Sequence, residues 1–386
     1  TTYFVAAKAI DDATNEGPIQ SSGTFIFDNK VPDSAVVHPK EWPAYYNSGL
    51  STLSGTAADE TSKIAGVKLS VLKVNTSTYF DGIDFSKSTE VVLTATLYTS
   101  SWTYYDADLD PLIVHAEYYK VRCWAKDTTG NEQSTNSITS NQFLYDTKVP
   151  STTVQKPKGN DTSYEPTELA TISGTASDNV DGKAYSGIED KTKILIRILK
   201  EPNSYWYQAT KEWKTGENWF SSEDYDGDTS ATARWTCVIT TAAWESGKYY
   251  KITSKATDKA GNASAPGDEN RFRIAKPIDH FVVSNIVNTT AGQSSDVKIT
   301  AQDSDNNTAL GYTGTITFYT GDGTETPGTG NGLPGDYTFK AADEGVVILV
   351  SSVTLRKAAN NTPEAPVTRS VSCKDTGNAG INGTQS

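Results

Sequence analysis

Two short acidic segments place carboxylates at alternate positions, which is the spacing with which a loop can wrap a hard cation in oxygen ligands. One reads Asp-Tyr-Asp-Gly-Asp and the other Asp-Ala-Asp-Leu-Asp. Neither completes an EF-hand, because the distal Glu is misplaced. We therefore predict calcium as the ligand, with a solvated acidic loop as the alternative. The predicted ligands are Asp224, Asp226 and Asp228 in one loop and Asp106, Asp108 and Asp110 in the other.

Two further aspartates stand at sequence junctions. Asp28 and Asp146 each precede a Lys-Val-Pro segment. At a boundary between domains, a carboxylate could bridge neighbours through a metal ion. The alternative is that each Asp caps the turn before Val-Pro through its own backbone amides.

Tryptophans are concentrated between residues 206 and 244. An exposed row of indole rings can stack on sugars, because the rings offer large apolar faces of fixed geometry. We take Trp213 and Trp219 as candidate sugar-stacking residues, and core and edge packing within the sandwich as the alternative.

The sequence contains no recognisable catalytic motif. The three histidines, His38, His115 and His280, are far apart, and no zincin motif, Gly-x-Ser-x-Gly segment or phosphate loop is present. Among 47 acidic residues, accidental carboxylate pairs are to be expected. We predict that the chain is not an enzyme. Cys123 aligns with small inward-facing residues of the other repeats and is expected to be a buried free thiol.

Composition excludes several classes of protein. The net charge is −13 and the isoelectric point about 4.8, so a nucleic acid would be repelled. No apolar run approaches the length of a membrane span. The chain does not begin with Met, and we expect a processed or partial product. An acidic surface keeps a secreted protein soluble and supplies oxygen ligands for calcium.

These features are carried by internal repeats. Tyr119–Asp127 and Tyr250–Asp258 alternate apolar and polar residues, which is the pattern of strands with one buried face. Tyr3–Asp11 repeats the pattern, and each copy ends in an Asp followed by a turn. Ser-Gly-Thr-Ala-x-Asp opens a unit at residues 54–59 and again at 173–178. From about Ile278 the pattern changes to a related series of strands.

The spacing of the repeats predicts the domains. Asp127 follows Asp11 by 116 residues, and Asp258 follows Asp127 by 131. Units of this length built from short strands are typical of β-sandwiches. We therefore predict an all-β protein of tandem sandwiches in an elongated array. Its predicted parts are a partial unit of two strands at residues 1–31, then sandwiches at 32–149, 150–276 and 277–386. The partial unit leads us to expect that the chain starts inside a domain.

The strand-turn motif and the Ser-Gly-Thr-Ala-x-Asp opening resemble the bacterial immunoglobulin-like repeats of large cell-surface proteins, including adhesins and S-layer proteins. The resemblance implies immunoglobulin-like sandwiches at the extracellular surface of a cell. It implies a structural role in an S-layer, filament or adhesin stalk, with copies of the chain or neighbouring repeats as partners. The alternatives are carbohydrate-binding accessory modules of a secreted enzyme, with glycans as partners, and a filament subunit completed by a neighbour's strands. Seven Asn-x-Ser/Thr triplets would carry glycans only in a host with the machinery.

Overall fold

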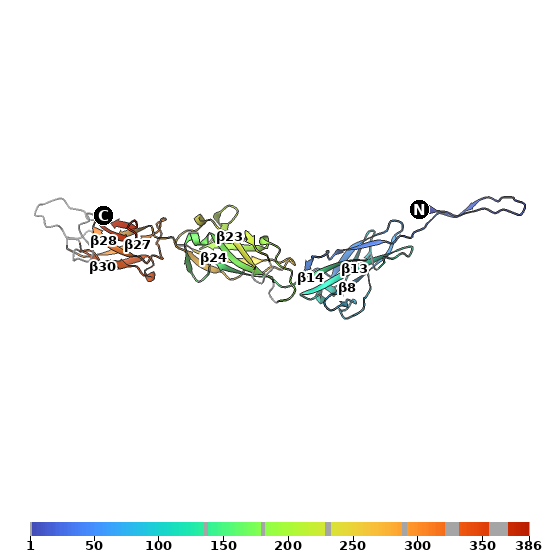
Figure 1. Cartoon of the computed structure of the whole chain (residues 1–386), viewed down its shortest axis with the longest axis horizontal. Helices are drawn as coiled ribbons and strands as arrows, with labels where there is room; N and C mark the ends of the chain where they lie inside the picture. Colours follow the sequence, from blue (N-terminus) through green and yellow to red (C-terminus); the bar gives the residue numbers. More distant parts are fainter. Residues whose placement is uncertain are drawn as a thin grey trace. The chain divides into compact units, whose positions relative to one another are not determined.

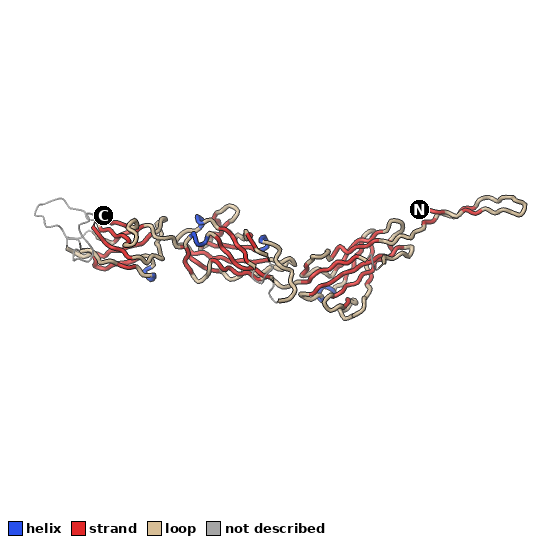
Figure 2. The backbone as a smooth tube through the Cα atoms, in the orientation of Figure 1, coloured by secondary structure: helices blue, strands red, loops and turns tan. Residues whose placement is uncertain are grey.

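The computed structural model describes residues 2–134, 138–178, 182–227, 233–287, 292–320, 332–354 and 370–385. Strands dominate these residues, which confirms the all-β prediction (Figure 2). None of the described helices has the length and hydropathy that a membrane crossing requires. The chain divides into two compact units. The first comprises Thr1–Pro150, Ser177–Glu189 and Thr257–Ser264, and the second Ser151–Ala176, Asp190–Ala256 and Ala265–Ser386.

The first unit begins with a two-stranded hairpin (Figure 1). β1 (Thr2–Tyr3) pairs with β4 (Phe25–Ile26), and β2 (Ala6–Ala7) pairs with β3 (Gln20–Ser21), all antiparallel. No third strand joins either pair within the part of the chain that the structure describes.

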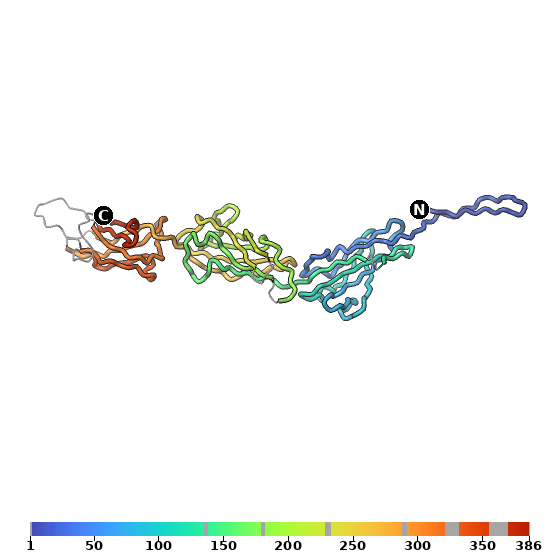
Figure 3. The backbone as a smooth tube through the Cα atoms, viewed as in Figure 1, coloured from blue at the N-terminus to red at the C-terminus, as the bar shows by residue number. Residues whose placement is uncertain are grey.

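Two sheets follow, and they share one apolar core. One has the order β10-β8-β13-β14-β6, with β9 paired to β8, and the other has the order β11-β12-β7-β5. Figure 3 shows the blue start of this sandwich running beside its teal end, where β5 lies against β13 and β14. Trp102, Tyr119 and Phe143 are among the fully buried core residues. The elements are β5 (Asp33–His38), β6 (Tyr45–Tyr46), β7 (Thr52–Ala58), β8 (Ile64–Lys73), β9 (Thr78–Tyr79), β10 (Leu93–Thr94), β11 (Thr96–Leu97), β12 (Ser101–Tyr105), α1 (Leu109–Leu112), β13 (Glu117–Asp127) and β14 (Thr139–Tyr145).

A second pair of sheets repeats this arrangement, with the orders β15-β17-β23-β22 and β16-β25-β24-β18-β19-β20. β21 pairs with β18 outside the second path. The elements are β15 (Ser151–Lys156), β16 (Thr162–Tyr164), the 3-10 helix Pro166–Leu169, β17 (Thr171–Ser177), the 3-10 helix Lys191–Lys193, β18 (Ile194–Lys200), β19 (Ser204–Tyr207), β20 (Glu212–Thr215), β21 (Phe220–Ser221), β22 (Asp224–Tyr225), β23 (Arg234–Val238), the 3-10 helix Thr241–Ala243, β24 (Tyr249–Ala256) and β25 (Asn270–Ile274).

The third pair of sheets has the orders β26-β27-β30 and β29-β28-β31-β32 around a core that includes Phe318 and Phe339. Alternating burial along β28 places Ile316 and Phe318 in this core and leaves Thr317 between them half-buried, as the sequence period requires. The elements are β26 (His280–Ser284), β27 (Ser295–Gln302), β28 (Thr315–Thr320), β29 (Tyr337–Thr338), the 3-10 helix Ala341–Asp343, β30 (Val346–Val353), β31 (Val371–Asp375) and β32 (Asn382–Gln385).

Candidate metal centre

The turn after β13 is built around the carboxylate of Asp127. Its Oδ1 accepts hydrogen bonds from the backbone amides of Thr129 (2.8 Å), Gly130 (2.7 Å) and Asn131 (2.9 Å). Its Oδ2 accepts a bond from the side-chain amide of Asn131 (2.8 Å). An Asp at the end of a strand followed by Gly and Asn is a turn signal. The result is a carboxylate held rigidly at 1 % exposure.

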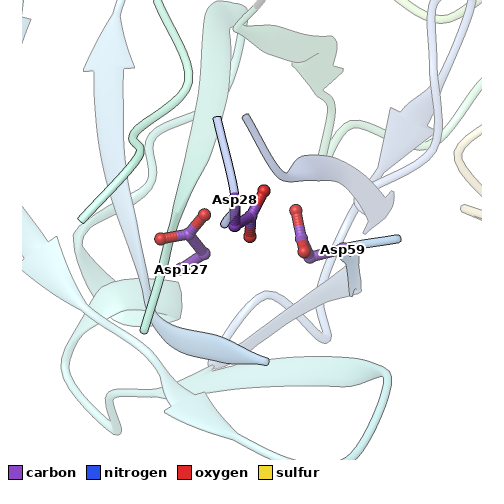
Figure 4. A group of neighbouring side chains, drawn as sticks. All are labelled: Asp28, Asp59 and Asp127. Atoms are coloured by element: carbon purple, nitrogen blue, oxygen red, sulfur yellow. The ribbon is translucent and has the colours of Figure 1, made fainter. Parts of the chain in front are cut away.

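Two other aspartates converge on this turn. Asp59 follows β7, and its Oδ1 accepts bonds from the amides of Thr61 and Ser62. Asp28 follows β4 and lies before the Lys-Val-Pro segment. One carboxylate oxygen from each of Asp28, Asp59 and Asp127 lies within 4.8 Å of the others. Figure 4 shows the three side chains approaching one another from separate segments. We call these three residues the first triad.

The same arrangement recurs one repeat later, still within the first compact unit. Asp146, Asp178 and Asp258 bring one oxygen each within 4.8 Å of the others, and we call them the second triad. Asp146 precedes the second Lys-Val-Pro segment, Asp178 ends the second Ser-Gly-Thr-Ala-x-Asp motif, and Asp258 follows β24. All three side chains are buried, with exposures of 0, 1 and 3 %.

Both triads contain a carboxylate oxygen that is buried without a hydrogen-bond partner. These atoms are Oδ2 of Asp59 and Oδ1 of Asp178. The other oxygen of Asp178 accepts bonds from the amide of Gly187 (2.7 Å) and the hydroxyl of Ser186 (3.2 Å). A buried, unpaired carboxylate oxygen costs several kcal/mol, so a cation beside it would offset a real penalty.

The two triads differ in their electrostatics. Burial is the largest cause that raises the pKa of Asp178, the neighbouring Asp146 and Asp258 also raise it, and the bond from Gly187 opposes them, so that the pKa is about 7. Burial also raises the pKa of Asp258. At Asp127, desolvation raises the pKa, but the bonds from Asn131, Thr129 and Gly130 outweigh it and bring the pKa to about 2. Hydrogen bonds from Ser62 lower the pKa of Asp59.

These donor sets fit a hard divalent cation. Calcium takes six to eight oxygen ligands, and carboxylates are the strongest of them. Each triad offers three carboxylates without a Cys or neutral His among the grouped ligands, which argues against zinc. The Nδ1 atom of His115 lies 3.3 Å from Asp146 Oδ1, behind the second triad. Water and backbone carbonyls would complete the coordination.

The chain has weak similarity to solved structures. No protein-family model matches it, and no curated protein matches it either. Fibronectin(III)-like modules of CbhA from Clostridium thermocellum match at 13 % identity and a TM-score of 0.30, over 63 % of this chain and 95 % of that one. A Ca²⁺-stabilized adhesin of an Antarctic bacterium matches at 11 % identity and a TM-score of 0.29, over 100 % and 81 %. A 1.5-MDa bacterial ice-binding adhesin matches at 10 % identity and a TM-score of 0.31, over 92 % and 95 %. Similarities at this level say nothing about what this chain binds.

Among the described residues, the loop predicted from Asp106, Asp108 and Asp110 does not form such a group. Asp106 accepts bonds from the amide of Asp108 (3.0 Å) and the hydroxyl of Tyr104 (3.0 Å), and Asp110 accepts one from the amide of Gly49 (3.0 Å). The carboxylates of Asp106 and Asp110 therefore accept bonds from their own surroundings. Asp106, Asp108 and Asp110 form no group of three potential ligands, because the two triads are the only such groups found among the described residues.

The other predicted loop is partly described. Asp224 Oδ1 accepts a bond from the amide of Tyr225 (3.0 Å), and Asp226 Oδ1 accepts one from the amide of Arg234 (2.6 Å). Asp228 lies outside the described residues. Each of the two described carboxylates thus stabilises its own strand end.

The rings of the two candidate sugar-stacking tryptophans contact other side chains of the sandwich. Trp213 packs among Trp206, Trp244 and Tyr250 and donates a hydrogen bond to the carbonyl of Ala243 (2.8 Å). The ring of Trp219 has Lys255 Nζ at 4.3 Å and the Arg197 guanidinium at 5.2 Å from its centroid. Both rings are partly buried against neighbouring side chains, and sugar stacking stays a prediction.

The sequence carried a signal for the triads that the alternate-spacing rule missed. The six residues occupy three matched positions in two aligned repeats. The third repeat has Asp303 after β27 but Ala275 where Asp28 and Asp146 stand. An aspartate at each of the same three motif positions in both repeats is the pattern that could have identified both sites.

Proposed function

We propose that the chain is a structural protein of a bacterial cell surface, in which calcium bound at the two triads holds the repeat loops together. The observation that carries the proposal is the buried, unpartnered Oδ1 of Asp178 within a repeated group of three carboxylates. Such a carboxylate group repels itself when it is empty and becomes favourable when a divalent ion occupies it.

The position of the triads supports a mechanical role. In the first triad, the aspartate that precedes Lys-Val-Pro meets the turns that follow β7 and β13. In the second triad, the equivalent aspartate meets the turns that follow β17 and β24. The Pro residue restricts φ in that connecting segment. A cation bound there would lock the connection and resist extension. Extracellular calcium modules bind at about 0.1–1 mM, so calcium at a few millimolar would add roughly 1–2 kcal/mol per site.

The partners we propose are copies of the chain or neighbouring repeats, in an S-layer, a surface filament or an adhesin stalk. A surface role would use exposed faces of sandwiches instead of a reaction pocket, and we propose no catalytic activity. Electron micrographs of the native material would separate a lattice from a filament and from isolated stalks. Absence of the protein from washed cell envelopes would contradict the proposed location.

Calcium binding is tested by equilibrium dialysis with the full chain. We expect two sites per chain, one for each triad. Asp258→Asn should remove one of them. Asp303→Asn is the matched control, because Asp303 is equally buried and caps the same kind of turn, with bonds from the amides of Asp305 (2.9 Å) and Asn307 (3.0 Å), but belongs to no triad. Equal losses in the two variants, or no bound calcium in the unaltered chain, would refute the proposal.

A further inference from the structure

The N-terminal hairpin exposes side chains that belong in a protein core. Tyr3 is 45 % exposed and Phe25 is 46 % exposed, and their rings stack on each other at 5.9 Å. Their apolar neighbours Val5 and Phe27 are 60 % and 62 % exposed. A two-stranded hairpin is only marginally stable in water. Several large apolar side chains exposed next to one another usually mark an interaction site.

Two hairpins elsewhere in the chain show what this surface looks like when it is covered. The ring pair Tyr119–Phe143 stacks at 5.6 Å, as does the pair Tyr250–Phe272. In both pairs the two residues face each other across the same antiparallel register as Tyr3 and Phe25. There, however, all four residues are at most 1 % exposed.

The turn of the N-terminal hairpin is also the same. Asp11 Oδ1 accepts bonds from the amides of Ala13 (2.9 Å) and Asn15 (2.8 Å), and its Oδ2 accepts one from the Asn15 side chain (2.9 Å). Asn131 and Asn262 make the same side-chain bond to Asp127 and Asp258. Asp11 thus occupies the position that supplies one carboxylate to each triad.

The complete sandwiches identify what is missing beside the N-terminal hairpin. Along the edge that does not contact β14, β13 pairs with β8, from Tyr119↔Lys73 to Ala125↔Val67. β24 pairs with β18 in the same way. The inner face of β13 lies against β5 of the opposite sheet. The N-terminal hairpin has its own equivalent of β13 and β14, and no strand of the described residues pairs with it in the place of β5, β7 or β8.

We infer that the N-terminal hairpin is the closing hairpin of a further β-sandwich, and that its partner is an open sandwich lacking its last two strands. The partner presents a free strand edge equivalent to β8 and an apolar inner face that covers Tyr3 and Phe25. Asp11 then supplies one carboxylate of a third cation site, with two from the partner at the positions of Asp28 and Asp59. This last step rests on the proposed function, whereas the docking of the hairpin does not.

The test supplies such a partner from the chain's own sequence. Residues 28–116 hold the equivalents of the missing strands and the two carboxylates, and end where Glu117 begins β13. A second copy of residues 28–116 is fused directly before Thr1 of the full chain, because Thr1 aligns with Glu117. Fusion sets a high effective concentration without adding contacts. The measurement is amide hydrogen exchange across residues 2–27.

We expect fast exchange across residues 2–27 in the unaltered chain and slowing of about 100-fold or more in the fusion, as core strands acquire protection on folding. Tyr3→Asp should abolish the protection, because the equivalent Tyr119 is fully buried. Phe4→Lys is the matched control and should leave it intact, because the equivalent residue is already Lys120. A fusion of residues 28–146, which carries its own hairpin, gives the unprotected baseline.

Fast exchange at residues 2–27 in the 28–116 fusion would overturn the inference. An added segment that stays unfolded would also overturn it, and so would equal loss of protection in Tyr3→Asp and Phe4→Lys. Calcium dialysis provides the separate readout. The fusion should bind one more ion than the unaltered chain, and Asp11→Asn should remove only that ion. Protection without bound calcium would refute the proposed cation sites and leave the docking intact.

Discussion

Gly174 lies directly beneath the indole ring of Trp235. A Cβ on Gly174 would stand 2.4 Å from Trp235 Cζ2 and 1.9 Å from the carbonyl oxygen of Thr153. Gly55 and Trp102 repeat the relationship in the first sandwich, where a Cβ would stand 2.5 Å from the ring and 2.0 Å from the carbonyl oxygen of Ala35. The Gly of the Ser-Gly-Thr motif is therefore required by a buried tryptophan on the neighbouring strand.

Gly174→Ala should consequently destabilise the chain strongly. The new methyl group meets backbone on one side and a fully buried ring on the other, so neither can yield cheaply. Overpacking of a core costs about 1–3 kcal/mol and sometimes more. Urea unfolding followed by tryptophan fluorescence measures the loss. Gly182→Ala should cost less, because a methyl group at Gly182 would meet no atom within 4 Å beyond its chain neighbours, although φ there is positive. The reverse order would contradict this account.

The strands of the sandwiches show how much of the fold the sequence could predict. The strict alternation of Tyr119–Asp127 predicted β13, and the structure extends it by only two residues, to Glu117. The alternation of Tyr250–Asp258 likewise predicts β24, which runs from Tyr249 to Ala256. Alternation is a local property, and it reports burial of one face directly.

The predicted metal loops show where local patterns end. Asp106, Asp108 and Asp110 have suitable spacing, but a short helix beginning at Leu109 and bonds to Tyr104 and Gly49 hold them apart from any grouped ligands. Triads assemble from three segments that are far apart in sequence, and only the folded chain brings them together. Trp219 is similar, since nothing local predicts that Lys255 and Arg197 would contact its ring.

Asp178→Asn should act in opposite directions with and without calcium. In chelator at pH 8, where Asp178 is ionised, the substitution removes one of three buried negative charges, and we expect the free energy of unfolding to rise by roughly 1 kcal/mol. In 5 mM calcium it removes a ligand, so the unaltered chain should be the more stable by about the same amount. Differential scanning calorimetry in the two buffers measures both. Asp303→Asn should show no such reversal, and a calcium-independent effect of Asp178→Asn would exclude the second triad as a cation site.

The stability of the calcium-free chain should depend on pH through the second triad. The folded pKa of Asp178 is about 7, above its unfolded value of about 3.9. Below pH 4 the carboxyl is protonated in both states. Between pH 4 and 7 the unfolded chain releases this proton while the folded chain retains it. The free energy of unfolding should therefore fall as pH rises across this window, by up to about 1.4 kcal/mol per pH unit.

Chelator-treated protein, unfolded by urea at half-unit steps of pH, measures this slope. Asp258, whose pKa burial also raises, contributes in the same direction. Asp178→Asn should flatten the slope, and millimolar calcium should reduce it because the cation displaces the proton. Asp127 contributes a pH dependence of the opposite sign to the free energy of unfolding. Its low pKa stabilises the fold above pH 4, and that contribution is lost as pH falls toward 2. A slope that is identical in Asp178→Asn would rule out this assignment.

Sugar binding provides the last prediction, because other side chains contact the rings of Trp213 and Trp219. A sugar stacking on a ring face that Lys255 or Arg197 contacts would have to displace that cation, and each contact contributes about 0.5–1 kcal/mol at an exposed site. We expect no binding on a glycan array and no change in tryptophan fluorescence with millimolar oligosaccharide. Trp219→Ala should instead lower the melting temperature by a few degrees through the lost cation contacts. Array binding that disappears in Trp219→Ala but persists in Phe4→Lys would favour a carbohydrate-binding module over a purely structural repeat.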